Sequence, residues 1–118
     1  MNILVVEDSE DVRKTICSSL EDYGVLEACD GIEALRLLAS ARPGLALIDV
    51  LLPGSLSGLA IAARAKSLGI PVLLMTGGDM REVDLAGFVC IRKPFSLAVL
   101  LDHIERQAGG YRAPGKVA

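Results

Sequence analysis

The chain has 118 residues, of which 52% are hydrophobic and 23% charged, and its formal net charge is −3. This length and composition predict one globular domain with its own core, and the charge gives no electrostatic support for binding nucleic acid. No apolar run is long enough to span a membrane, and residues 1–8 lack the features of a signal peptide, so a cytoplasmic protein is expected. The cysteines at positions 17, 29 and 90 have no metal or disulfide spacing and are expected to be free thiols.

Short apolar runs alternate with amphipathic segments in the first half of the chain. The pattern predicts a strand at residues 2–6, a helix at 10–22, a strand at 25–29 and a helix that starts at Asp30. Asp30 and Glu33 have the spacing of a helix capping box. The residues expected on the apolar face of that helix are Ile32, Leu35, Leu38 and Ala39.

The same alternation continues in the second half. It predicts strands at residues 45–49, 70–76 and 88–92, a helix at 58–68, and a last helix capped by Ser96. The glycine-containing segment 77–87 can hold at most about two helical turns, so a fourth helix there is expected to be short or mobile. The domain is expected to span residues 1–108, followed by a flexible tail at 109–118. The apolar face of the last helix is expected to consist of Leu97, Leu101, Ile104 and Ala108.

Five apolar strands that alternate with helices predict an α/β fold, a doubly wound parallel sheet covered by helices on both faces. In such sheets the ligand site lies beyond the carboxyl ends of the strands. The second strand ends without a polar residue, whereas the other strands end in side chains that carry chemistry. These polar residues are Glu7, Asp8, Asp49, Thr76 and Lys93.

Three neighbouring carboxylates cannot all stay ionised without a cation, and hard oxygen ligands in a partly open site favour Mg²⁺. Thr76 and Lys93 would then donate hydrogen bonds to a phosphoryl group. Asp49, expected to be the most exposed carboxylate at a strand end, is the candidate nucleophile. Each residue alone has an ordinary structural explanation, such as a helix cap for Asp49 or a turn hydroxyl for Thr76. Their joint placement at one edge of the sheet favours a functional site.

Five segments in register carry a resemblance to a known family. From residue 1 to about residue 108, the chain resembles the receiver domain of two-component response regulators, which implies a flavodoxin-like five-stranded fold. The segments are VVED at 5–8, DGIEAL at 30–35, LIDVLLP at 47–53, LLMTGG at 73–78 and RKPF at 92–95.

The resemblance implies a role for each residue at the edge of the sheet. Asp49 would be the phosphoacceptor, Thr76 would hydrogen-bond the phosphoryl group, and Lys93 would pair with its oxygens. The bond between Lys93 and Pro94 would be cis. The implied Mg²⁺ ligands are Asp8, Asp49 and the backbone carbonyl of Leu51, with Glu7 acting through a water molecule.

The chain departs from the usual family pattern in several places. Cys90 stands where most receivers have an aromatic residue, and Phe88 lies two positions earlier on the same strand face. The loop after Asp49 is one residue longer than usual before Gly58. Residues 71–78 partly match a receiver subgroup with the motif P-F-x-F-A-T-G-[YG], which also lacks the aromatic residue. Leu51 and Gly78 cannot orient a hydrolytic water, so slow self-dephosphorylation is expected.

The resemblance favours a single-domain response regulator that is not an enzyme toward an external substrate. A histidine kinase or phosphotransfer protein would donate the phosphoryl group, and output would pass by protein contact to an unknown partner. Neither nucleic acid nor membrane is expected as a partner. One alternative is an interaction module that works without phosphorylation. Another is a Mg²⁺-dependent phosphatase, although Leu51 stands where such an enzyme would need a second acidic residue.

Overall fold

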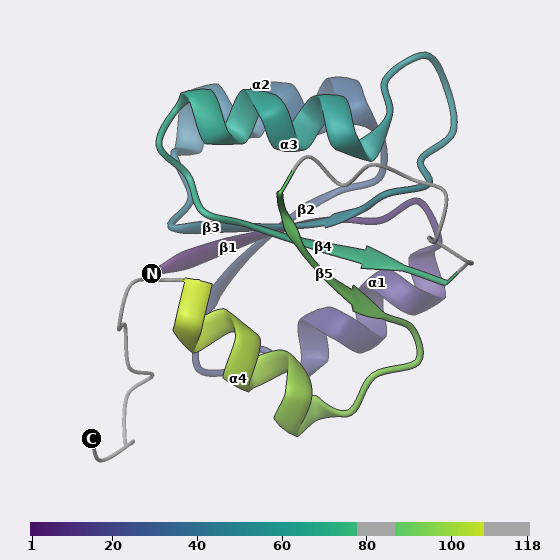
Figure 1. Ribbon diagram of the computed structural model, residues 1–118, viewed down its shortest axis with the longest axis vertical. Helices are drawn as coiled ribbons and strands as arrows, with labels where there is room; N and C mark the ends of the chain where they lie inside the picture. Colours follow the sequence, from purple (N-terminus) through teal and green to yellow (C-terminus); the bar gives the residue numbers. More distant parts are fainter. Residues whose placement is uncertain (78–86, 108–118) are drawn as a thin grey trace.

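The computed structural model describes residues 1–77 and 87–107, which form one five-stranded parallel sheet in the order β2-β1-β3-β4-β5. Helices α2 and α3 cover one face, and α1 and α4 cover the other (Figure 1). The predicted doubly wound α/β fold is therefore confirmed. The strands are β1 (Asn2–Val6), β2 (Gly24–Ala28), β3 (Leu45–Asp49), β4 (Val72–Thr76) and β5 (Val89–Arg92). The helices are α1 (Glu10–Ser18), α2 (Gly31–Ala41), α3 (Gly58–Ser67) and α4 (Leu97–Gln107).

Alternate residues of the central strands pack into two separate layers, because successive side chains of a strand point to opposite faces. All five residues of β3 are buried, as expected for a strand covered on both faces. The α2/α3 core includes Val6, Ile48, Leu74, Leu38 and Ile61. The α1/α4 core includes Val5, Leu47, Leu73, Ile16 and Leu100.

Helix α1 ends at Ser18, four residues before the predicted end at residue 22. The hydroxyls of Ser18 and Ser19 both donate to the carbonyl of Thr15, at 2.9 and 3.1 Å. Such local hydrogen bonds compete with helix propagation. The N–H of Leu20 donates to the carbonyl of Cys17 at 3.1 Å, which tightens the last turn and buries Leu20. Leu20 has the spacing of a helical apolar residue and therefore suggested a longer helix, but it is buried from the turn that follows α1.

The predicted apolar faces of two helices are rotated in the structure. Ile32 is 77% exposed, whereas Ala34 and Leu38 are buried. Gly31 explains the rotation of α2, because a Cβ at this position would lie 2.7 Å from Leu56 Cβ and 3.1 Å from Ile61 Cδ1. The side of α2 that carries Gly31 therefore faces the core. In α4 the buried residues are Leu100 and Ile104, whereas Leu97 is 49% exposed and Leu101 partly buried.

Both predicted helix caps are present. Asp30 Oδ1 accepts from the N–H of Glu33 at 2.8 Å, and Ser96 Oγ accepts from the N–H of Val99 at 3.2 Å. The predicted short fourth helix within 77–87, the tail at 109–118 and Ala108 lie largely or wholly outside the described residues. In the part of the chain that is described, none of the helices combines the length and apolarity needed to cross a membrane.

Candidate functional site

The strand register brings the predicted site residues to one edge of the sheet. Val6 pairs with Ile48, so Glu7 follows β1 beside Asp49 at the end of β3. Asp49 pairs with Met75, and Thr76 with Arg92, which places Thr76 and Lys93 at the same edge. Strand alternation puts Glu7 and Asp49 on the face covered by α1 and α4.

Lys93 joins two carboxylates that are far apart in the sequence. Its Nζ lies 2.9 Å from Asp49 Oδ2 and 3.0 Å from Glu7 Oε1. Glu7 is 2% and Asp49 6% exposed, whereas Asp8 is exposed. The prediction that Asp49 is the most exposed carboxylate of the site is therefore wrong. Burial shields the Asp49 carboxylate from solvent, and pairing with the Lys93 ammonium fixes its orientation at the end of β3.

The three groups shift one another's pKa values. Burial raises the pKa of Glu7 to about 7, with a further contribution from the neighbouring Asp49 and an opposing one from Lys93. Burial alone would also raise the pKa of Asp49, but its interactions with Glu7, Lys93 and the N–H of Leu51 lower it overall. Burial alone would lower the pKa of Lys93, but Asp49 and Glu7 raise it. Asp49 is therefore ionised and Lys93 protonated at neutral pH.

The raised pKa of Glu7 predicts that stability without Mg²⁺ falls as the pH rises. A folded-state pKa of about 7 against the ordinary 4.5 means that the folded protein binds the proton more tightly than the unfolded chain. This contribution is complete below pH 4.5 and is lost as the pH rises through 7. Because each tenfold difference in proton affinity corresponds to about 1.4 kcal/mol, the free energy of unfolding should fall by roughly 1–3 kcal/mol.

Urea unfolding in EDTA at several pH values between about 5 and 8 would measure this loss, and Glu7→Gln provides the control. The variant has no carboxyl to titrate at this position, so its profile should be flatter. Mg²⁺ should restore stability at the alkaline end by binding the ionised carboxylates of the folded state. This explanation would be contradicted if the stability of the wild type in EDTA did not change with pH. It would also be contradicted if the stability of Glu7→Gln fell as steeply with pH as that of the wild type.

The carboxylates fit a divalent cation. Oxygen atoms of Glu7, Asp8 and Asp49 all lie within 4.8 Å of one another. Among the described residues, none donates a hydrogen bond to the buried Glu7 Oε2, so this oxygen has no protein partner to neutralise it, as expected of an oxygen that binds a cation. Oxygen ligands of this kind are those that Mg²⁺ prefers. The N–H of Leu51 donates to Asp49 Oδ1 at 2.9 Å, while the role of the Leu51 carbonyl stays a prediction.

The remaining predicted residues lie on β4 and β5 or directly beside them. Thr76 is 3% exposed, and its carbonyl accepts from the N–H of Lys93 at 2.7 Å. The bond between Lys93 and Pro94 is cis, as predicted. Cys90 on β5 and Phe88, which directly precedes the strand, both pack against the α2/α3 core, so they lie on the same side of the sheet as expected. Lys66 Nζ lies 5.8 Å from the Phe88 ring centre, but a switching role for Phe88 stays a prediction.

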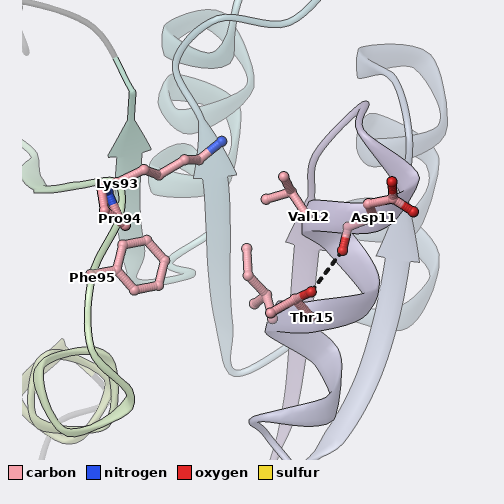
Figure 2. A pocket seen from close by; sticks show the side chains of 7 residues that line it. Asp11, Val12, Thr15, Lys93, Pro94 and Phe95 are labelled. Atoms are coloured by element: carbon pink, nitrogen blue, oxygen red, sulfur yellow. Dashed lines mark hydrogen bonds between the residues drawn. The ribbon is translucent and has the colours of Figure 1, made fainter.

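A groove of about 480 Å³ opens beside Lys93, between α1 and the segment that follows β5. Figure 2 shows Val12 and Thr15 on one side, facing Pro94 and Phe95 on the other. The Thr15 hydroxyl donates to the carbonyl of Asp11 at 2.9 Å. Sequence reasoning missed this groove, because its walls come from opposite ends of the chain.

Sequence reasoning also missed the role of Arg13. Its Nη1 donates to the carbonyl of Glu7 at 2.9 Å, and its Nε donates to Glu27 Oε1 at 3.0 Å. Neither Arg13 nor Glu27 belongs to a motif, and the contact requires β2 to lie beside β1. No local pattern could have indicated it.

The fold and the site together define a class of α/β protein in which carboxylates and a lysine meet at the carboxyl edge of a doubly wound sheet. Residues 3–105 match the response regulator receiver domain, and the chain belongs to this family. It is 38% identical over 110 residues to response regulator MprA of Mycobacterium avium (strain 104), covering 86% of this chain and 48% of that protein. The chain thus spans about half the length of the curated relatives it matches.

Solved structures agree with this assignment. The signal receiver domain of a modulated diguanylate cyclase from Desulfovibrio desulfuricans G20 is 31% identical, with a TM-score of 0.81, covering 91% of this chain and 92% of that one. The receiver domain of the sensor histidine kinase PA1611 from Pseudomonas aeruginosa PAO1 is 28% identical, also with a TM-score of 0.81. That comparison covers 92% of this chain and 97% of the other, which has a magnesium ion coordinated in its active site cleft.

Proposed function

We propose that this protein accepts a phosphoryl group on Asp49 in a Mg²⁺-dependent phosphorelay. The observation that carries the proposal is the buried Asp49, which is only 6% exposed and has one carboxylate oxygen 2.9 Å from Lys93 Nζ. The lowered pKa of Asp49 keeps it ionised and able to act as a nucleophile. The receiver domain is taken to comprise residues 1–108.

In the proposed reaction, an Asp49 oxygen attacks the phosphorus of the donor. A new O–P bond forms, the bond from phosphorus to the donor's leaving group breaks, and the leaving group departs with the electron pair. Lys93 is released from its contact with Asp49 as the aspartate charge is consumed, and its ammonium pairs with phosphoryl oxygens. Thr76 donates a hydrogen bond to the same group. Asp8, Asp49 and the Leu51 carbonyl would hold Mg²⁺, with Glu7 acting through a water molecule, and the ion would neutralise charge on the phosphoryl oxygens.

The groove in Figure 2 supports a protein as the donor, such as a histidine kinase or phosphotransfer protein. Lys93 belongs to both the groove and the site, so a helix seated against Val12 and Phe95 would bring its phosphohistidine to Asp49. The receiver domain itself is proposed to pass its output by protein–protein contact, because the chain's net charge of −3 offers little attraction for nucleic acid. Self-dephosphorylation is proposed to be slow, since Leu51 is apolar and 65% exposed and offers no group to orient a water molecule.

Incubation with acetyl phosphate and Mg²⁺ tests the proposal. Intact-protein mass spectrometry should show the gain of one phosphoryl group, and EDTA should prevent it. A protein that folds and binds Mg²⁺ but gains no phosphoryl group would favour the alternative, an interaction module that works without phosphorylation. Sustained hydrolysis of a generic phosphate ester would instead indicate a phosphatase.

The same assay separates the chemistry from the docking of the donor. Thr15→Arg places a long side chain in the groove at an exposed position of α1. It should leave uptake from acetyl phosphate unchanged and slow transfer from a histidine kinase that phosphorylates the wild type. Equal slowing with both donors would show that the substitution disturbs the site rather than docking.

A further inference from the structure

Arg13 on α1 joins the candidate site to the edge strand of the sheet. Its two donors reach the backbone carbonyl of Glu7 at 2.9 Å and Glu27 Oε1 on β2 at 3.0 Å. The Arg13 side chain is only 13% exposed. A guanidinium is planar and rigid, so these two contacts fix the Glu7 carbonyl relative to β2.

The carbonyl that Arg13 contacts belongs to the peptide group between Glu7 and Asp8. Because this group is planar, the direction of its oxygen sets the direction in which the chain leaves β1 toward Asp8. The N–H of Glu7 donates to the carbonyl of Ala28 at 3.1 Å, so β2 also holds the other side of the residue. Glu27 immediately precedes Ala28, and the backbone of the acidic pair is therefore held from β2 by two routes.

We propose that Arg13 is a positioning residue that orients Glu7 and Asp8 for Mg²⁺, with Glu27 as its anchor. The inference rests on the proposed Mg²⁺ site and adds to it a residue that touches neither cation nor phosphoryl group. Mg²⁺ demands near-octahedral geometry, so small displacements of its ligands reduce affinity. Removing groups that orient metal ligands typically lowers metal affinity roughly 10–100-fold.

The charge of Arg13 and its contact with Glu7 have opposite effects on a cation. The positive charge repels Mg²⁺, so an electrostatic effect alone would make binding tighter when Arg13 is neutralised. Loss of positioning would make binding weaker. Lys14 provides a matched control, because its Nζ lies 3.2 Å from the same Glu27 carboxylate and its side chain is 59% exposed. Lys14→Gln removes one positive charge from that carboxylate and leaves the contact between Arg13 and Glu7 in place.

Amide chemical-shift titrations of the unphosphorylated protein with MgCl₂ would measure the affinity. Arg13→Gln should bind Mg²⁺ roughly tenfold more weakly than the wild type. Lys14→Gln alters an exposed ion pair, so its Mg²⁺ affinity should stay within roughly twofold of the wild-type value. Arg13→Lys keeps the charge without the planar fork and should also bind more weakly. Ca²⁺ tolerates irregular ligand geometry, so Arg13→Gln should lose less affinity for Ca²⁺ than for Mg²⁺.

The possible outcomes separate this inference from the proposed function. A wild type without Mg²⁺ binding would overturn the proposed metal site itself. A wild type that binds, with Arg13→Gln binding equally or more tightly, would overturn only the positioning role. If the amide spectrum shows that Arg13→Gln is unfolded, Glu27→Ala replaces it, since it removes the anchor and retains Arg13. Glu27→Ala should bind Mg²⁺ several-fold more weakly, and unchanged affinity would again overturn the role.

Discussion

Asp49→Asn is expected to abolish phosphoryl uptake from acetyl phosphate while the protein stays folded. The amide has nearly the shape of the carboxylate but lacks a nucleophilic oxygen, and loss of a nucleophile typically lowers a rate by roughly 10³-fold or more. Lys93 keeps its partner Glu7 Oε1 at 3.0 Å, so the partly buried ammonium remains paired. Intact-protein mass spectrometry would measure the uptake, and urea unfolding would confirm the fold.

Asp8→Asn is the matched control for this prediction. It removes a carboxylate of the same cluster but leaves Asp49 and its contact with Lys93 intact. It should weaken Mg²⁺ binding and slow uptake, yet still yield the singly phosphorylated protein at high Mg²⁺. A stable acyl phosphate on Asp49→Asn would show that another residue is the acceptor.

Gly58→Ala is expected to destabilise the protein and slow phosphorylation, because Gly58 sits directly against the backbone that carries Asp49. A Cβ at Gly58 would collide with the backbone oxygen of Asp49 and lie 2.7 Å from Val50 Cα. The N–H of Gly58 also donates to the carbonyl of Val50 at 3.2 Å, which holds the start of α3 close to the end of β3. Backbone cannot rotate away as a side chain can, so the loss should be about 1–3 kcal/mol or more.

Gly77→Ala provides the comparison for stability. A Cβ at Gly77 would meet no heavy atom within 4 Å, and φ there lies outside the left-handed region. Alanine at such a position commonly stabilises a protein by about 0.4–1 kcal/mol through the unfolded chain. Urea unfolding of both variants would test the difference. If Gly58→Ala is as stable as Gly77→Ala, the close approach of α3 to β3 does not constrain the site.

The polar ends of the strands could be identified from the sequence because each directly follows a local apolar run. Glu7 follows β1, Asp49 ends β3 and Lys93 follows β5, and a parallel sheet brings such ends to one edge. The caps at Asp30 and Ser96 were also predictable, since they join residues three apart. The apolar runs and the caps each involve residues that are close together in the sequence, within one strand or one or two helical turns.

The exposure of Asp49 could not be predicted in the same way. Lys93 is 44 residues from Asp49 and 86 from Glu7, and its ammonium reaches both only after β1, β3, β4 and β5 have assembled. Asp49 was expected to be exposed because the site was expected to be open to solvent. The compensating charge from a distant strand instead allows both carboxylates to be buried.

Periodicity and caps are local properties, so the order and type of the described elements and the residues at the carboxyl edge of the sheet could be predicted from the amino-acid sequence. Which face of α2 turns inward could not, since that depends on the contact of Gly31 with Leu56, a residue of another segment. The tertiary structure also decided that Arg13 reaches Glu7 and Glu27, because β2 must first pair with β1. Contacts between residues distant in sequence arise from register and packing, which no local pattern encodes.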